Sequence, residues 1–244
     1  PSANPMNFEK REQITEAIDH SLDAITDQLD HFRKLTDHTN KENLLPSISV
    51  IEEELRLARS ELDAVKFFIV SFGILKSGKS TLVNLLVGRK ETTPTRLGKD
   101  TTLRPCVIMQ GECDSLQIFN APSIGSEAER KIAFNRTIDH LRGSIDKNTL
   151  STESGIIRTD YELTPENVEK ALCEKSGLQG HDPLITAITL KDCSELMSND
   201  VAILDLPGLD SEELRENSSR VLRLLERCDL LLFIQSTISA LNKE

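Results

Sequence analysis

The chain has 244 residues, with 40 acidic against 29 basic side chains and a net charge of −11. So acidic a chain is a poor partner for polyanions, and we expect no nucleic-acid partner. Its five cysteines show no CxxC spacing, which argues against a disulfide framework or a zinc site and favours a reducing compartment. The longest apolar run is strand-sized and the first residues lack a leader pattern, so we expect a cytoplasmic protein that does not span a membrane.

Residues 1–65 carry most of the net negative charge and predict a pair of helices. Apolar residues from Ile14 to Phe32 recur at steps of three and four, which places them on one face of a helix over 8–35. A polar stretch over 36–48 predicts a loop, and Ser49 with Glu52 has the spacing of a capping box that starts a second helix. We therefore expect an α-helical hairpin that forms an incomplete helical arm.

From Lys66 onward the pattern changes to short apolar runs that alternate with helical segments. Strands are expected at 67–72, 105–109, 116–119, 184–190, 201–204 and 229–234, and helices at 81–87, 124–142, 165–176 and 211–227. This alternation indicates a three-layer α/β domain over 66–244, with a largely parallel sheet and helices on both faces.

The string GILKSGKST over 73–81 matches GxxxxGK[ST] between a predicted strand and a predicted helix. Glycines let the backbone wrap an anion, and the helix N-terminus favours negative charge. The pattern indicates a P-loop NTPase in which Lys79 reaches the β- and γ-phosphates and the Ser80 hydroxyl binds Mg²⁺. The candidate phosphate-binding residues are Leu75, Lys76, Ser77, Gly78, Lys79, Ser80 and Thr81.

A second string, DLPG over 205–208, ends an apolar strand. Asp205 is expected in the Mg²⁺ shell, and Gly208 places a backbone N–H beside the γ-phosphate. P-loop ATPases usually have a glutamate after this aspartate as their base, whereas Leu206 stands here. The string therefore disfavours an ATPase.

The loop between the two strings supplies a threonine candidate. A GTPase switch needs a threonine whose hydroxyl binds Mg²⁺ and whose carbonyl holds the attacking water, and both Thr101 and Thr102 are candidates. The expected metal ligands are therefore Ser80, Asp205 and one of these threonines.

Together the P-loop, the string Thr102–Pro105 and the DLPG string resemble the GTPase domain of the dynamin superfamily, best its bacterial dynamin-like branch. The resemblance covers residues 49–244 and selects Thr102 as the switch threonine. It implies GTP and GDP as ligands with Mg²⁺, GTP hydrolysis with Lys76, Lys79 and Thr102 as catalytic residues, pairing of G domains, and a role in membrane remodelling. The alternative is a non-hydrolysing, nucleotide-dependent scaffold that recruits a protein partner.

The resemblance also implies features outside 1–244 and one departure inside it. A guanine-reading motif is absent from the chain, so we expect this motif, a stalk and a lipid-contacting segment beyond residue 244, and a bundle-signalling role for the helical arm. Lys76 stands where related proteins place an arginine finger. It is interpreted either as a cation that acts in cis or as a solvated loop lysine.

Overall fold

The structure is a computed structural model, which describes residues 5–36, 41–62, 64, 66–74, 76–90, 92–94, 104–120, 126–146, 150, 156–174, 183–197, 200–208 and 218–235. Two compact units divide the chain, Pro1–Ala64 and Val65–Glu244. None of the described helices combines the length and the apolar character that a membrane span requires.

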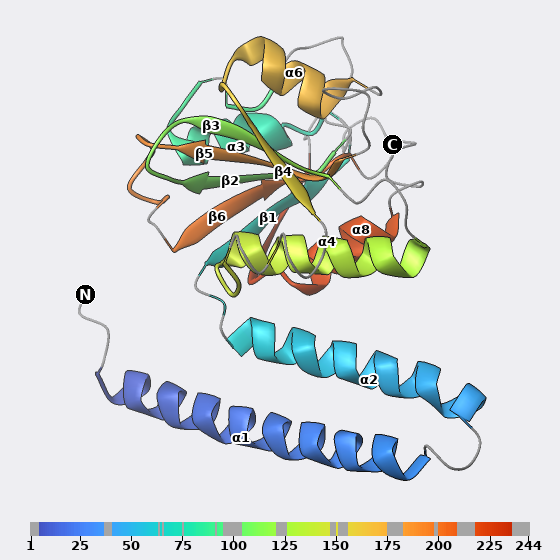
Figure 1. The fold of residues 1–244 in the computed structure, drawn as a ribbon. Coiled ribbons are helices and arrows are strands. Elements are labelled where there is room, and N and C mark those ends of the chain that lie inside the picture. Colours follow the sequence, from blue (N-terminus) through green and yellow to red (C-terminus); the bar gives the residue numbers. More distant parts are fainter. Residues whose placement is uncertain are drawn as a thin grey trace, which may run out of the picture. The chain divides into compact units, whose positions relative to one another are not determined.

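The first unit holds two antiparallel helices, α1 (Pro5–Thr36) and α2 (Lys41–Leu62), as the predicted hairpin requires (Figure 1). Arg59 of α2 forms ion pairs with Asp19 and Asp23 of α1, at 3.2 and 2.5 Å. Leu22, between these two acids, is buried. The contacts therefore join the last turns of α2 to the middle of α1.

The predicted loop over 36–48 is too long, because α2 already begins at Lys41. Pro46 lies inside the helix, in its second turn, where the ring removes one backbone hydrogen bond. The five residues before it, KENLL, include good helix formers, which favours the earlier start. The Ser49–Glu52 spacing is therefore not a helix start.

The second unit is built on a seven-stranded sheet with the strand order β4-β3-β5-β2-β6-β1-β7. The helices of this unit that the structure describes lie on both sides of the sheet (Figure 1). The strands are β1 (Phe67–Gly73), β2 (Cys106–Gln110), β3 (Ser115–Asn120), β4 (Ile157–Tyr161), β5 (Pro183–Leu190), β6 (Val201–Asp205) and β7 (Leu230–Ile234). The helices are α3 (Lys79–Val87), α4 (Glu127–Arg142), α6 (Pro165–Cys173) and α8 (Ser218–Glu226).

The expectation of a largely parallel sheet is wrong, since the sheet is mixed. The pairs β1–β6, β1–β7 and β2–β5 are parallel, whereas β2–β6, β3–β4 and β3–β5 are antiparallel. A parallel crossover needs a dozen or more residues. Only residues 111–114 join β2 to β3, and no described helix joins β5 to β6, so the chain reverses direction at both places.

Alternate residues of the central strands feed two separate cores, which confirms the three-layer α/β fold. On β1, Phe68 and Val70 pack in the core that contains α4 and α8, whereas Ile69 packs with α3 and α6. Strands buried on both faces are near-continuous apolar runs, which is why the sequence predicts β1, β2, β5 and β6. Edge strand β4 was not predicted, because three polar residues occupy its centre.

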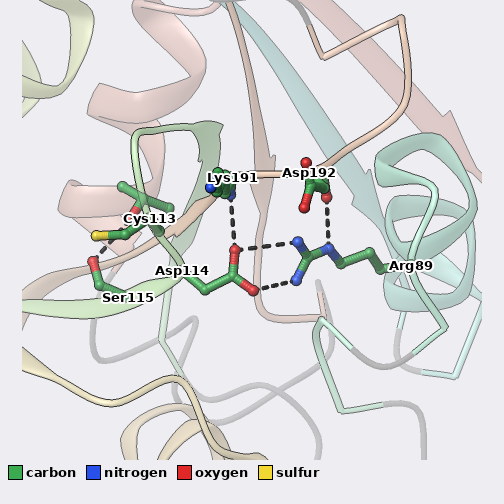
Figure 2. A network of polar contacts seen from close by, with 7 residues as sticks. Arg89, Cys113, Asp114, Ser115, Lys191 and Asp192 are labelled. Carbon is green, nitrogen blue, oxygen red and sulfur yellow. Dashed lines mark hydrogen bonds and ion pairs between the residues drawn. The ribbon is translucent and has the colours of Figure 1, made fainter.

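Polar contacts connect the C-terminal end of α3 to the loops after β2 and β5 (Figure 2). Arg89, two residues after the helix, binds both carboxylate oxygens of Asp114 at 2.6 and 3.1 Å and donates to the Asp192 carbonyl at 2.7 Å. Asp114 also accepts from the main-chain N–H of Lys191. The β2–β3 and β5–β6 connections therefore hold this end of α3.

Two isoleucines of α4 differ in burial, and this difference tests which face of the helix packs in the core. Ile138 is fully buried between α4 and the sheet, whereas Ile132, on the same helix, is 43% exposed. We expect Ile138→Ala to lower the free energy of unfolding by about 2–5 kcal/mol and Ile132→Ala to change it by less than about 0.5 kcal/mol. Urea unfolding of both variants measures this, and equal effects would contradict the assigned face of α4.

Candidate functional site

The turn between β1 and α3 has a glycine at each end, and each glycine stands where another residue would be disfavoured. A Cβ on Gly73 would lie 2.2 Å from the carbonyl oxygen of Ile234 in β7. Gly78, the residue before α3, has a φ of +96°, in the left-handed region that favours glycine. Lys76 is also left-handed, with a φ of +58° and an exposed side chain. The turn therefore wraps around the N-terminus of α3.

Lys79, the first residue of α3, folds back over this turn. Its side chain is buried, and its ammonium donates to the carbonyl oxygens of Gly73 and Ile74 at 3.1 and 2.9 Å. These two contacts hold a positive charge inside the turn, at the end of the helix whose dipole is also positive. A buried cation at this place is suited to an anionic ligand.

Asp205, the last residue of β6, is completely buried beside this helix end. Its Oδ2 accepts a hydrogen bond of 2.7 Å from Ser80 Oγ, and its Oδ1 accepts one of 3.2 Å from Ser71 Oγ. The parallel register of β1 and β6 pairs Ser71 with Asp205, which is why the two side chains meet. Three elements, β1, β6 and α3, therefore converge on one carboxyl group.

Burial and polar neighbours act in opposite directions on this carboxyl group. Loss of solvation raises the pKa of Asp205 above its ordinary value of 3.8, and the Ser80 hydroxyl, the Lys79 charge and the Ser71 hydroxyl offset part of that rise. The net effect is a carboxyl group that holds its proton more tightly than in water. A cation placed beside it would favour the charged form.

The structure brings together some of the predicted site residues. Lys79, Ser80 and Asp205 lie around the turn, and Gly208 is buried three residues after Asp205. Ser77 is half-buried, whereas Lys76, Gly78 and Thr81 are exposed. The predicted residues Leu75, Thr101 and Thr102 lie outside the described residues.

Sequence reasoning missed two contributors to this site. Ser71 lies in an apolar strand, and its role depends on which strand pairs with β1, which no local pattern reveals. Asn84, inside α3, binds the main chain of Thr93 at 2.8 and 2.9 Å. A buried asparagine on the apolar face of a short helix was the available signal.

The polar atoms present suit a phosphate group and a hard cation. Ser77 Oγ is buried in the turn with no hydrogen-bond partner among the described residues, so an anion there would satisfy it. The hydroxyl of Ser80 and the carboxyl of Asp205 are oxygen ligands, the type that Mg²⁺ takes. Within the described ranges no group of three His, Cys, Asp or Glu side chains could hold a metal. Mg²⁺ commonly needs only one or two carboxylates besides ligand phosphates and water.

Comparison with known proteins gives a family match but no curated relative. Residues 69–244 match the profile described as the Dynamin family. No curated protein matches the chain. Two similar solved structures belong to an oligomerised bacterial dynamin pair described as a mechanism for long-range sensing and tethering of membranes. They share 18% and 19% identity and TM-scores of 0.40 and 0.37, and each alignment covers 91% of this chain. The chain spans 28% of the length of those proteins.

The raised pKa of Asp205 predicts how the stability of the protein changes with pH, and unfolding experiments can test this. Stability from a raised carboxyl pKa is complete below 3.8 and is lost as the pH rises through the folded-state value. Asp205→Asn removes that loss, so in metal-free buffer the variant should gain stability relative to the wild type between pH 4 and pH 7. Urea midpoints at several pH values measure the gap.

Asp114→Asn is the control of opposite sign. Hydrogen bonding from Arg89 lowers the pKa of Asp114, so its stabilising contribution is present above 3.8 and lost as the pH falls. As the pH rises from about 2 to about 4, the Asp114 variant should therefore lose stability relative to the wild type, and above pH 4 the gap should stay nearly constant. If both gaps moved in the same direction, the assigned environment of Asp205 would be wrong.

Proposed function

Since the chain belongs to the dynamin family, we propose that it binds GTP and GDP with Mg²⁺ and hydrolyses GTP. One arrangement carries the proposal. The buried Lys79 ammonium lies inside the glycine turn, and the Ser80 hydroxyl meets the Asp205 carboxyl at 2.7 Å. A cation and a pair of oxygen ligands at a helix N-terminus suit a nucleoside triphosphate better than a neutral ligand.

Each residue of the turn has a proposed role in holding the nucleotide. Backbone N–H groups over 75–81 bind the phosphates, and Lys79 neutralises them. Ser80, Asp205 and the switch threonine Thr102 hold Mg²⁺, while Gly208 faces the terminal phosphate. When bound, Mg²⁺ supplies positive charge against the phosphate oxygens.

Lys76 is proposed as a further cation for the reaction, supplied in cis. Its side chain is exposed and its backbone is left-handed. A solvated loop lysine would have the same exposure, so the variant described below decides between the two roles.

For the whole protein, we propose a dynamin-like GTPase that pairs through its G domain or its helices and acts at a membrane surface. Segments outside 1–244 would make the membrane contact, and the protein would otherwise be cytoplasmic. Family membership supports this part of the proposal. The family resemblance at DLPG favours guanine over adenine.

A second candidate is a nucleotide-dependent scaffold that does not hydrolyse GTP. It is favoured by Leu209, the residue after the DLPG string, because a leucine cannot position an attacking water as a glutamine or histidine would. Single-turnover phosphate release with Mg²⁺ separates the two candidates. A scaffold would bind GTP and release no phosphate.

Nucleotide binding can be tested at Lys79, with Lys90 as its control. Lys90 is an exposed lysine just beyond the far end of α3. Lys79→Ala removes a buried cation and should weaken binding of a fluorescent GTP analogue about 100-fold, whereas Lys90→Ala should leave it unchanged. Competition with GTP and ATP, on a protein that includes the expected guanine-reading motif, reports the base preference. Equal affinity of the wild type and the Lys79 variant would reject the site.

Turnover can be tested at Lys76. Lys76→Ala should lower the rate of GTP hydrolysis at least about 10-fold with nearly unchanged affinity, because a transition-state cation acts after binding. Phosphate release under single-turnover conditions measures this, and Lys76→Arg should retain activity. A loss of affinity without a loss of turnover per bound nucleotide would assign Lys76 to binding.

A further inference from the structure

The side chain of Asn84 forms hydrogen bonds with the chain segment that follows α3. Asn84 lies one turn after Ser80 on α3 and is 4% exposed. Its Oδ1 accepts from the main-chain N–H of Thr93 at 2.8 Å, and its Nδ2 donates to the carbonyl of Thr93 at 2.9 Å. One amide therefore pairs with both main-chain groups of Thr93, as a neighbouring strand would do.

The hydroxyl of Thr93 extends this contact toward the first turn of α3. Thr93 is 1% exposed, and its Oγ1 lies 3.1 Å from Asn84 Oδ1 and 3.4 Å from the carbonyl oxygen of Ser80. A hydroxyl has one proton to donate, so the two acceptors share it. Both acceptors belong to α3, so Thr93 bridges Asn84 and the turn that carries Ser80.

Ser80 is the residue that links α3 to Asp205. Its hydroxyl donates to the Asp205 carboxyl, while its carbonyl faces Thr93. A shift of this turn would therefore move the Ser80 hydroxyl away from Asp205. Mg²⁺ demands near-ideal octahedral geometry, so small displacements of its ligands weaken its binding.

We propose that Asn84 and Thr93 are positioning residues for the nucleotide site. They clamp residues 92–94 onto α3 and hold Ser80 where its hydroxyl meets Asp205, and they thereby set the Mg²⁺-dependent part of the nucleotide affinity. The clamp itself rests on the geometry of the described residues. Its consequence for nucleotide binding rests on the proposed function.

The chain offers a matched control at the neighbouring residue. Thr92 is 4% exposed, and its Oγ1 has no hydrogen-bond partner among the described residues. Thr92→Val and Thr93→Val make the same change of shape and chemistry at two adjacent buried positions. Only Thr93→Val removes a hydrogen bond to α3, and it leaves Asn84 Oδ1 bonded to the Thr93 N–H.

The clamp is tested first without nucleotide, by amide hydrogen exchange on the complete chain. We expect the amides of residues 82–87 to exchange about 5- to 10-fold faster in Thr93→Val, which corresponds to one lost hydrogen bond. Thr92→Val should match the wild type. Asn84→Asp places a second oxygen against the Thr93 carbonyl and should give a larger increase. Equal rates in Thr92→Val and Thr93→Val would overturn the clamp.

The consequence is tested by the affinity of a fluorescent GTP analogue with Mg²⁺ and with EDTA. Thr93→Val should weaken binding about 5- to 10-fold in Mg²⁺ and leave binding in EDTA unchanged. Thr93→Ser, which keeps the hydroxyl, should restore the wild-type value. A merely structural role would weaken binding equally under both conditions, and that result would overturn the positioning role.

Failure of the proposed function gives a different result from failure of the clamp. If the wild type bound no nucleotide under either condition, GTP binding would be rejected, and with it the role in Mg²⁺ affinity. The exchange rates of the two valine variants would still decide whether Thr93 holds α3.

Discussion

A carboxyl group without exposed surface stands where β1, β6 and α3 meet. Burial of Asp205 is costly unless polar partners surround it, and the hydroxyls of Ser71 and Ser80 supply them from two different elements. Because Ser71 reaches Asp205 only in the observed β1–β6 register, one group constrains both strands and the helix. The curl of the turn before Lys79 follows from the same constraint, since that turn must join β1 to α3 over a few residues.

The helix that follows the turn is restrained at three places along its length. Ser80 meets Asp205 at its start, Asn84 holds Thr93 at its middle, and Arg89 binds Asp114 beyond its end. At that same end, Ser194 donates its main-chain N–H to the carbonyl of Val87 at 2.8 Å. A site carried by so restrained an element keeps its side chains in one geometry, which is what ligand binding by several converging groups requires.

The sequence predicts those features that depend on residues close together in the chain, and it does not predict those that depend on residues far apart in the chain. The glycine turn, the helix after it and the doubly buried strands follow from spacing and apolar runs within a few residues. The mixed sheet does not, because strand direction depends on how β2, β3 and β5 interleave. Edge strand β4 was not predicted for a different reason, since a strand covered on fewer sides needs fewer apolar residues. Ser71 was missed because it acts through a strand 134 residues away.

The cysteines of the second unit differ from one another in their reactivity toward thiol reagents. All five are free, and only Cys113, in the β2–β3 connection beside Asp114, is exposed. Burial raises the pKa of the Cys106, Cys193 and Cys228 thiols, which lowers their content of reactive thiolate. A maleimide dye would therefore label Cys113 first, next to the carboxylate that holds Arg89 at the far end of α3. The native chain thus carries its own attachment point for a fluorophore that reports on this helix.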